Sequence, residues 1–326
     1  MKAYQPKNIK AHNQALLLSL LKEEHRGMTK RQLAEAADLS VVTVNKLLPE
    51  MVDNQWIIPL DIPQKTGGRR ALAYQFNAMR ALVLVIQFVE AHQKIRVSFF
   101  ITDLNGAVMS TIKEAVTDSK AFQQSLKNIK QTYPSIYKTV VGIPGVEVKG
   151  KLELMDAAAF KGVALRSIIA AEISDEIIIE NDVNAAVMTY RQDAAIVAAI
   201  YFPELFPPGA ALVIGDHLFT GANQMSGEIK YLPHFDTVSF PLTLSDVSKH
   251  VAASVQAMIA MYDPHKIVVF IPRTWSELIS PRTITSYLAA ASGAFIVPEI
   301  TVETDFSQAC LTGLIQIGRD APQMVM

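Results

Sequence analysis

The sequence has a single cysteine, no long apolar stretch and no strong net charge. Cys310 is the only cysteine among 326 residues, which excludes an internal disulfide framework and a cysteine-rich structural zinc site. The longest uninterrupted apolar run, 194–202, has nine residues, whereas a membrane helix needs about 20. The polar N-terminus lacks the apolar segment of a signal peptide. We therefore predict a cytoplasmic protein with no membrane partner.

Composition and charge separate the start of the chain from the rest. Half of the residues are apolar and 19% are charged, which excludes bulk disorder. Residues 1–76 contain eleven Lys and Arg and seven Asp and Glu, a balance of +4. The other 250 residues contain nineteen and twenty-four, a balance of −5. This asymmetry favours an anionic partner for the first segment alone.

The start of the chain has the pattern of three helices followed by a hairpin. Leucines recur at helical spacing within 13–24, and Thr29 and Ser40 are placed to cap two further helices. Two extended segments, 56–60 and 71–76, flank a turn that contains glycine, as in a wing. This order predicts a winged helix-turn-helix whose second helix enters a DNA major groove.

The predicted recognition helix carries side chains suited to DNA at its N-terminal end. An amide can pair with adenine and a threonine methyl can contact thymine, while cations of a wing contact phosphate or a minor groove. The predicted DNA-binding residues are Ser40, Val42, Thr43, Asn45 and Lys46 on the helix and Lys65, Arg69 and Arg70 in the wing. The alternative is a three-helix bundle whose exposed residues only keep it soluble.

Pro49 conflicts with an uninterrupted recognition helix. A proline in a helix interior removes a hydrogen bond and costs about 3 kcal/mol. We therefore expect the helix either to kink at this residue or to end at Leu48. Both outcomes leave the DNA-reading residues 42–46 ahead of the break.

The remainder of the chain has the pattern of a mixed α/β body. Three strand candidates, 81–88, 94–102 and 107–116, precede alternating helices and strands, and a second block with a similar order begins at residue 194. This arrangement indicates two related halves. The predicted domains are a DNA-binding domain at 1–76, a first α/β lobe at 81–193 and a second α/β lobe at 194–326.

Four segments of the sequence carry a specific resemblance. The first is HNQALLLSLLKEEHRGMTKRQLAEAADLSVVTVNKLLPEM followed by TGGRRA, and the others are VVGIPGVEV, EIIIENDVNAAVM and LFTGANQMSGEI. In this order they resemble the winged helix and the kinase-like body of the ROK family, which comprises repressors, open reading frames and sugar kinases. The resemblance implies a two-lobed actin/hexokinase-like ATPase fold for 81–326, and assembly as a homodimer through that body.

The same resemblance implies a set of ligand-binding residues. Asp182 corresponds to the base that accepts a proton from the attacking sugar hydroxyl, and Asn181 and Glu228 correspond to ligands of sugar hydroxyls. Tyr231 stands at the position of a zinc-binding histidine that also contacts the sugar, so we include it and expect no metal site. The residues themselves place Asn181 and Asp182 directly after an apolar strand, where α/β folds bind ligands. A polar helix cap is their alternative role.

The nucleotide-binding segments of the family's kinases are absent. QFVEAHQK stands where a glycine-containing phosphate loop would be, and PELFPPG replaces the second phosphate loop with prolines, which lack N–H donors. The Gly-Gly of the adenosine segment is missing from VVFIPRTW. We therefore predict no enzyme activity, no catalytic residues and no cofactor.

The interpretation favoured by the sequence is a transcriptional regulator of sugar metabolism, most simply a repressor, with a catalytically inactive sensor and dimerisation body. Its expected partners are a double-stranded DNA operator, a second copy of the chain and a sugar or sugar-phosphate effector. Two alternatives stay open: a carbohydrate kinase with an attached winged helix, and an interaction module without a small ligand. Whether Asn181, Asp182 and Glu228 line an open or a filled pocket separates the regulator from that module.

Overall fold

The computed structural model describes residues 6–24, 26–62, 71–91, 94–114, 116–155, 158–292 and 296–320. The chain divides into two compact units. Among the described residues, unit 1 comprises 6–82 and 103–107, and unit 2 comprises 83–102 and 108–320. No helix within these ranges combines the length and the apolarity that a membrane crossing requires.

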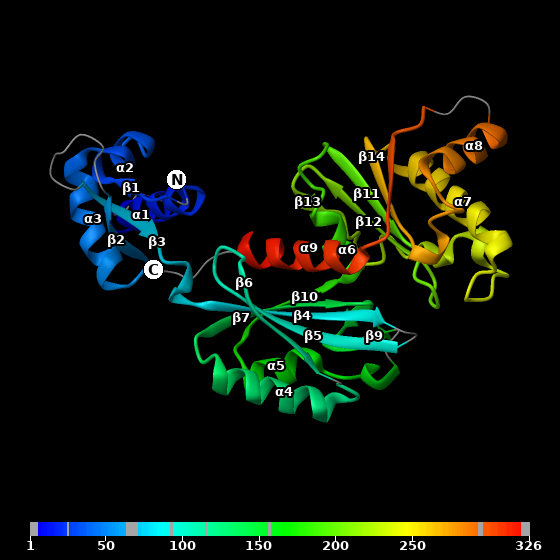
Figure 1. The fold of residues 1–326 in the computed structure, drawn as a ribbon, viewed down its shortest axis with the longest axis horizontal. Coiled ribbons are helices and arrows are strands. Elements are labelled where there is room, and N and C mark those ends of the chain that lie inside the picture. The colour runs from blue at the N-terminus through cyan, green and yellow to red at the C-terminus, as the bar shows by residue number, and fades with distance from the viewer. Residues whose placement is uncertain are drawn as a thin grey trace. The chain divides into compact units, whose positions relative to one another are not determined.

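Unit 1 consists of three helices and a small antiparallel sheet (Figure 1). Its helices are α1 (Pro6–Glu23), α2 (Lys30–Ala36) and α3 (Val41–Asp53). Its strands, in the order β1-β3-β2, are β1 (Met28–Thr29), β3 (Ala71–Phe76) and β2 (Ile57–Ile62). The two wing strands pair as predicted, whereas the two-residue strand β1 was not predicted. A winged helix-turn-helix results.

The helix starts of unit 1 are fixed by the caps that the sequence predicts. Thr29 and Gln32 form a capping box: the Thr29 hydroxyl accepts the Gln32 amide at 3.3 Å, and the Gln32 side chain accepts the Thr29 amide at 2.8 Å. The Ser40 hydroxyl accepts the amide of Thr43 at 3.0 Å. These bonds satisfy backbone donors that have no partner within a helix.

α3 continues through Pro49 and ends at Asp53, so the expectation that it ends at Leu48 is wrong. The buried side chains of α3 explain this continuation. Leu48 and Met51, on either side of Pro49, are each 1% exposed. Packing of this apolar face stabilises the last turn in spite of the hydrogen bond that proline removes.

Unit 2 contains two five-stranded sheets, and the first has the order β10-β7-β4-β5-β6. Its strands are β4 (Leu82–Ala91), β5 (Lys94–Thr102), β6 (Val108–Glu114), β7 (Ile136–Ile143) and β10 (Glu176–Asn181). A separate hairpin joins β8 (Gly145–Val148) to β9 (Lys151–Met155) and was not predicted.

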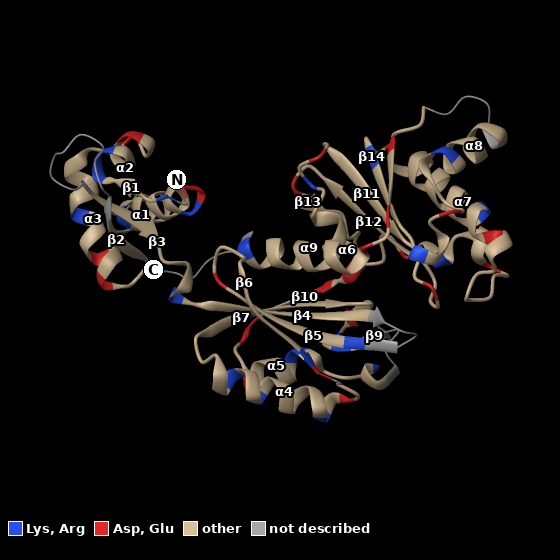
Figure 2. Ribbon diagram, viewed as in Figure 1, with Lys and Arg blue, Asp and Glu red and all other residues tan. Residues whose placement is uncertain are grey.

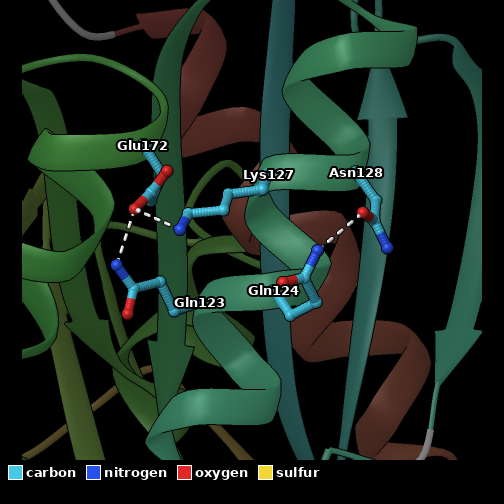
Figure 3. Close-up of polar contacts among 5 residues, drawn as sticks. All are labelled: Gln123, Gln124, Lys127, Asn128 and Glu172. Carbon is cyan, nitrogen blue, oxygen red and sulfur yellow. Dashed lines mark hydrogen bonds and ion pairs between the residues drawn. The ribbon is translucent and has the colours of Figure 1, made fainter.

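Helices α4 (Ser119–Thr132) and α5 (Leu165–Glu172) lie together on one side of this first sheet (Figure 1). Their apolar faces are buried at Phe122, Leu126 and Ile169. Polar contacts at the rim join the two helices: the Gln123 side chain donates to Glu172 at 2.6 Å, and Lys127 lies 3.8 Å from the same carboxylate (Figure 3). The pair closes this side of the sheet.

The second sheet has the order β13-β12-β11-β14-β15. Its strands are β11 (Ile196–Tyr201), β12 (Gly209–Ile214), β13 (His217–Leu218), β14 (Lys266–Phe270) and β15 (Glu299–Glu303), the last of which was not predicted. Helices α7 (Leu244–Tyr262) and α8 (Pro281–Ser292) accompany it (Figure 1). Short 3-10 helices are η1 (Ala78–Arg80), η2 (Ala158–Phe160), η3 (Ile229–Tyr231), η4 (Pro233–Phe235) and η5 (Arg273–Trp275).

Two helices, α6 (Asp182–Met188) and α9 (Phe306–Asp320), pack closely against each other in unit 2 (Figure 1). α9 falls within the predicted second lobe, 194–326, yet it packs on β7 of the first sheet. Lys138 of β7 donates to the carbonyl oxygen of Gly318 in α9 at 3.4 Å. The C-terminal helix therefore returns to the first lobe and supports the helix that carries Asp182.

Candidate ligand cavity and DNA-binding helix

The N-terminal half of α3 presents the predicted DNA-reading side chains on its outer face. Val42 is 63% exposed, and Ser40, Asn45 and Lys46 are exposed as well. Thr43 is half-buried, and its hydroxyl lies 2.8 Å from that of Ser40. The opposite face of α3 is buried in the unit. The helix therefore has the surface of a recognition helix, with an amide and a cation at its exposed end.

The described part of unit 1 carries both basic and acidic residues (Figure 2). Several of its cations contact other side chains: Lys10 pairs with Glu50, and the Arg80 guanidinium lies 3.9 Å from the centroid of the Trp56 ring. The predicted wing cations, Lys65, Arg69 and Arg70, lie outside the described residues. Within the described part, Lys46 is the cation that α3 offers.

In unit 2, strand β10 runs directly into α6, and the junction holds two predicted ligand residues. Asn181 is the N-cap of α6, because its side-chain oxygen accepts the amides of Val183 at 2.9 Å and Asn184 at 3.2 Å. The Asn181 amide group also donates to the carbonyl oxygen of Gly145 at 3.3 Å. Asp182, 7% exposed, accepts the Val183 amide at 2.9 Å. Asn181 therefore has the role of a helix cap, and these hydrogen bonds fix the side chains of Asn181 and Asp182.

Glu180 supports this junction and was not predicted as a functional residue. Its carboxylate accepts the side-chain amide of Asn184 at 2.7 Å and the backbone amide of Asn181 at 2.9 Å. Burial raises the pKa of the Glu180 carboxyl above its usual value, although both hydrogen bonds act in the opposite direction. The sequence feature that could have identified Glu180 is its position in the string ENDVNAA, immediately before Asn181 and Asp182.

Asn181, Asp182 and Glu228 line one cavity of about 580 Å³ in unit 2. The Glu228 carboxylate pairs with the Lys230 ammonium at 2.8 Å, and Lys230 lines the same cavity. Tyr231 is 62% exposed and is not among the lining residues. The cavity is open rather than filled by side chains, and its volume is typical of small-molecule sites, which have about 300–1,000 Å³.

Residues of the segments QFVEAHQK and PELFPPG form another part of the lining. Gln87, the first residue of QFVEAHQK, is buried and donates to the carbonyl oxygen of Ser307 at 2.7 Å. Residues 92 and 93 of this stretch lie outside the described residues. The cavity is also lined by aromatic and proline side chains, namely Phe88, Pro144, Tyr201, Pro203, Phe206, Pro207, Pro208, Pro272 and Phe306.

His234, which follows Tyr231 closely in the sequence, packs against α7. Its ring nitrogen lies 3.2 Å from the Ser254 hydroxyl, and its ring centroid lies 6.1 Å from that of His250. Burial, followed by the charge of His250, lowers the pKa of His234. Among the described residues, no three His, Cys, Asp or Glu side chains are grouped as metal ligands would be.

No family model matches the chain. A curated protein of Caldicellulosiruptor sp. (strain Rt8B.4), named "Putative xylose repressor", is 22% identical over 236 residues. This match covers 69% of the present chain and 59% of the relative. The chain therefore spans less than two thirds of the relative's length.

Two solved structures define the fold. A ROK-family transcriptional regulator, described as a homologue of the E. coli MLC protein, has a TM-score of 0.65 at 16% identity and covers 95% of this chain and 96% of its own. The chain has the ROK-family fold. A ROK-family glucokinase from Streptomyces griseus, solved with glucose and AMPPNP, has a TM-score of 0.55 at 13% identity and covers 74% of this chain and 100% of its own. The predicted fold class is confirmed, and the regulator matches more of the chain than the kinase does.

Proposed function

We propose that this protein is a sugar-responsive transcriptional repressor that binds operator DNA as a homodimer. The observation that carries the proposal is the capped N-terminal half of α3, which exposes Asn45 and Lys46 at the start of a recognition helix. The likeness to a xylose repressor in sequence and to a ROK-family regulator in fold supports it.

In this proposal α3 lies in the major groove and reads bases with its first turns. The Asn45 amide pairs with adenine, Val42 and Thr43 contact base edges or thymine methyls, and Lys46 contacts phosphate. The wing residues Lys65, Arg69 and Arg70 add phosphate or minor-groove contacts. A single winged helix with few phosphate contacts binds weakly, whereas two copies about 34 Å apart read a palindrome with much better specificity.

We also infer that the body is a sensor without kinase activity. Three of the seven residues in 202–208 are prolines, which offer no N–H to a phosphate. Asn181, Asp182 and Glu228 provide acceptors and donors for the hydroxyl groups of a sugar. A ligand there changes operator affinity only if it binds the DNA-competent and the released state unequally.

A carbohydrate kinase remains the second candidate, because Asp182 lines the cavity and the sequence resemblance makes it the counterpart of the family's base. Calorimetry with Mg-ATP and a coupled assay for sugar phosphorylation separate the two. We expect no micromolar ATP binding and no product. Product formation that the Asp182→Asn variant abolishes would identify a kinase and overturn the sensor assignment.

The DNA-binding proposal is tested by binding-site selection followed by affinity measurements at several salt concentrations. Lys46→Ala should weaken binding to all sequences and reduce the salt slope by about one. Asn45→Ala should instead relax the preference at one base position, by about 1–3 kcal/mol. Lys249→Ala, which changes an exposed cation of α7, is the matched control and should change neither.

Two results would contradict the proposal. The first is a selection that returns no enriched sequence at moderate salt. The second, which bears on the homodimer alone, is light scattering at micromolar concentration that detects only a 35.8 kDa species.

A further inference from the structure

The cavity of unit 2 has two chemically different walls. One wall carries Asn181, Asp182 and the Glu228–Lys230 pair, which are polar groups held by the start of α6 and by η3. Together these groups offer both hydrogen-bond donors and acceptors to the cavity, as recognition of sugar hydroxyl groups requires. This wall suits one sugar ring.

The other wall is aromatic and apolar. Tyr201, at the end of β11, and Phe306, at the start of α9, stack with ring centroids 3.5 Å apart and planes 5° apart. The edge of this stack is fixed by Phe270, whose ring centroid lies 5.3 Å from that of Phe306 at 75°. Phe206 and the prolines of 203–208 extend the apolar surface. The ring contacts fix Phe306 and Tyr201 in place, and an apolar planar group in the cavity can pack against this aromatic part of the lining.

The β11–β12 connection offers little to a phosphate. Pro203, Pro207 and Pro208 have no backbone N–H. The amides that bracket the connection are already used, because Phe202 donates to Phe270 at 2.9 Å and Ala210 donates to Gly227 at 2.8 Å. Between these amides, Glu204, Leu205, Phe206 and Gly209 retain an N–H, so the connection offers fewer donors to a phosphate than a glycine-rich loop of the same length would.

The charges of the lining also disfavour an anion. The described lining contains four carboxylates, Asp182, Glu204, Glu228 and Asp305, and three cations, Lys161, Lys230 and Arg273. Lys230 pairs with Glu228, and Lys161 and Arg273 are exposed, whereas Asp182 is buried. With four carboxylates against three cations, this lining favours a neutral ligand over a phosphate.

We propose that the effector is a neutral glycoside with a flat, apolar aglycone, such as an aryl glycoside. The sugar ring binds Asn181, Asp182 and Glu228, and the aglycone stacks in the apolar part lined by Tyr201, Phe206 and Phe306. This assignment rests on the proposed function, since it names the class of ligand that the sensor cavity takes. It distinguishes the ligand from a free sugar, which leaves the apolar wall uncovered, and from a sugar phosphate.

The test is calorimetric titration of the full chain with matched ligands. For each of glucose, xylose, galactose and N-acetylglucosamine, in both anomers, the p-nitrophenyl glycoside is compared with the methyl glycoside, with a disaccharide of similar size and with the sugar phosphate. We expect one p-nitrophenyl glycoside to bind at least about tenfold more tightly than its methyl counterpart and the disaccharide, because it buries an aromatic ring. The same compound should weaken operator binding.

Two variants test whether the apolar wall causes the tighter binding of the aryl glycoside. Phe206→Ala should weaken aryl glycoside binding much more than methyl glycoside binding and so remove most of the difference between them. Phe219→Ala is the matched control, because Phe219 is 42% exposed and is not among the lining residues. It should preserve the difference.

Equal affinities for aryl and methyl glycosides, equal binding of the disaccharide, tighter binding of a sugar phosphate, or no binding of any glycoside would each overturn the inference. Operator binding is measured on the same preparations. If it is intact, only the assignment of the ligand fails; if no operator is bound, the proposed function fails first.

Discussion

Two helices of this protein begin in the same way and lie in opposite surroundings. α3 starts at Ser40 and α6 starts at Asn181, and each cap side chain accepts backbone amides of the first turn. Beyond the cap, α3 buries one face and exposes the other, whereas α6 buries every residue except Asn184. The cap therefore sets where a helix starts, and burial decides whether its polar end meets solvent or a cavity.

The largest loss of stability is expected from a substitution at the contact between α9 and α6. Gly313 of α9 lies against α6 so closely that an added Cβ would be 1.7 Å from the carbonyl oxygen of Ala185. Backbone must move to relieve this overlap, so Gly313→Ala should destabilise unit 2 by about 3 kcal/mol or more, the upper end for overpacking. Chemical denaturation followed by circular dichroism measures the loss, and the transition of unit 1 should stay unchanged.

Gly318→Ala is the control for this prediction because it makes the same change in the same helix. There the added Cβ would meet a side-chain methyl of Val140 at 3.2 Å, which can shift slightly. A smaller effect is expected, partly offset by the better helix propensity of alanine. Similar losses in the two variants would show that the approach of α9 to α6 is not the constraint.

The features predicted from the sequence are those that depend on nearby residues. The caps Thr29 and Ser40 and the wing strands depend on short-range patterns, and the structure places them where expected. The pairing of β15 and the packing of α9 depend on contacts with distant parts of the chain. The periodicity of apolar residues in the sequence does not predict such contacts.

The ligand site shows the same division. Asn181, Asp182 and Glu228 were assigned by family resemblance, and the position of Asn181 and Asp182 after an apolar strand agreed with that assignment. That these three residues line one cavity and that Tyr231 lies outside its lining depends on the tertiary structure, which the sequence pattern does not predict. The stack of Tyr201 on Phe306 brings the end of β11 against the start of α9, which is distant in the sequence. No local sequence pattern predicts this contact.

The next largest change in stability is expected from a substitution inside α3. Pro49 is exposed in the interior of the helix and removes one backbone hydrogen bond. Pro49→Ala should stabilise unit 1 by about 1–3 kcal/mol, because it restores the bond and improves helix propensity. Thermal unfolding measures the gain, and operator affinity should be unchanged, since the residues at 42–46 precede this position.

Pro281→Ala serves as the comparison for Pro49→Ala. Pro281 is the first residue of α8, where the missing N–H has no helical partner to lose. Little or no stabilisation is expected there. A gain at Pro281 as large as that at Pro49 would mean that the change acts through the unfolded chain rather than through the helix.

The two caps should have effects of similar size in different units. Ser40→Ala should lower the stability of unit 1, and Asn181→Ala that of unit 2, by about 1 kcal/mol each, since each leaves first-turn amides without an acceptor. Ser40→Gly should cost only a few tenths of that. Separate denaturation transitions record which unit responds, and a loss of both transitions in either variant would contradict the comparison.

The smallest effect is a pH dependence confined to unit 2. Burial lowers the pKa of His234, and the neighbouring His250 lowers it further; burial also lowers the pKa of His250, with Asp246 opposing and Lys249 assisting. The unfolded chain therefore takes up protons near the ordinary histidine value of about 6.5, before the folded chain does. Stability from this pair is complete above that value and falls as the pH drops through it toward the lower folded pKa values.

The measurement compares denaturation of unit 2 at about pH 7.5 and about pH 5.5 in the parent protein and in a double variant, His234→Gln with His250→Gln. The variant cannot take up these protons, so its stability should fall less between the two pH values than that of the parent. Unit 1 within each protein is the internal reference, because neither substitution touches it. An equal fall in parent and variant would assign the acid sensitivity of unit 2 to carboxylates instead, and the two histidines would then contribute only packing between η4 and α7.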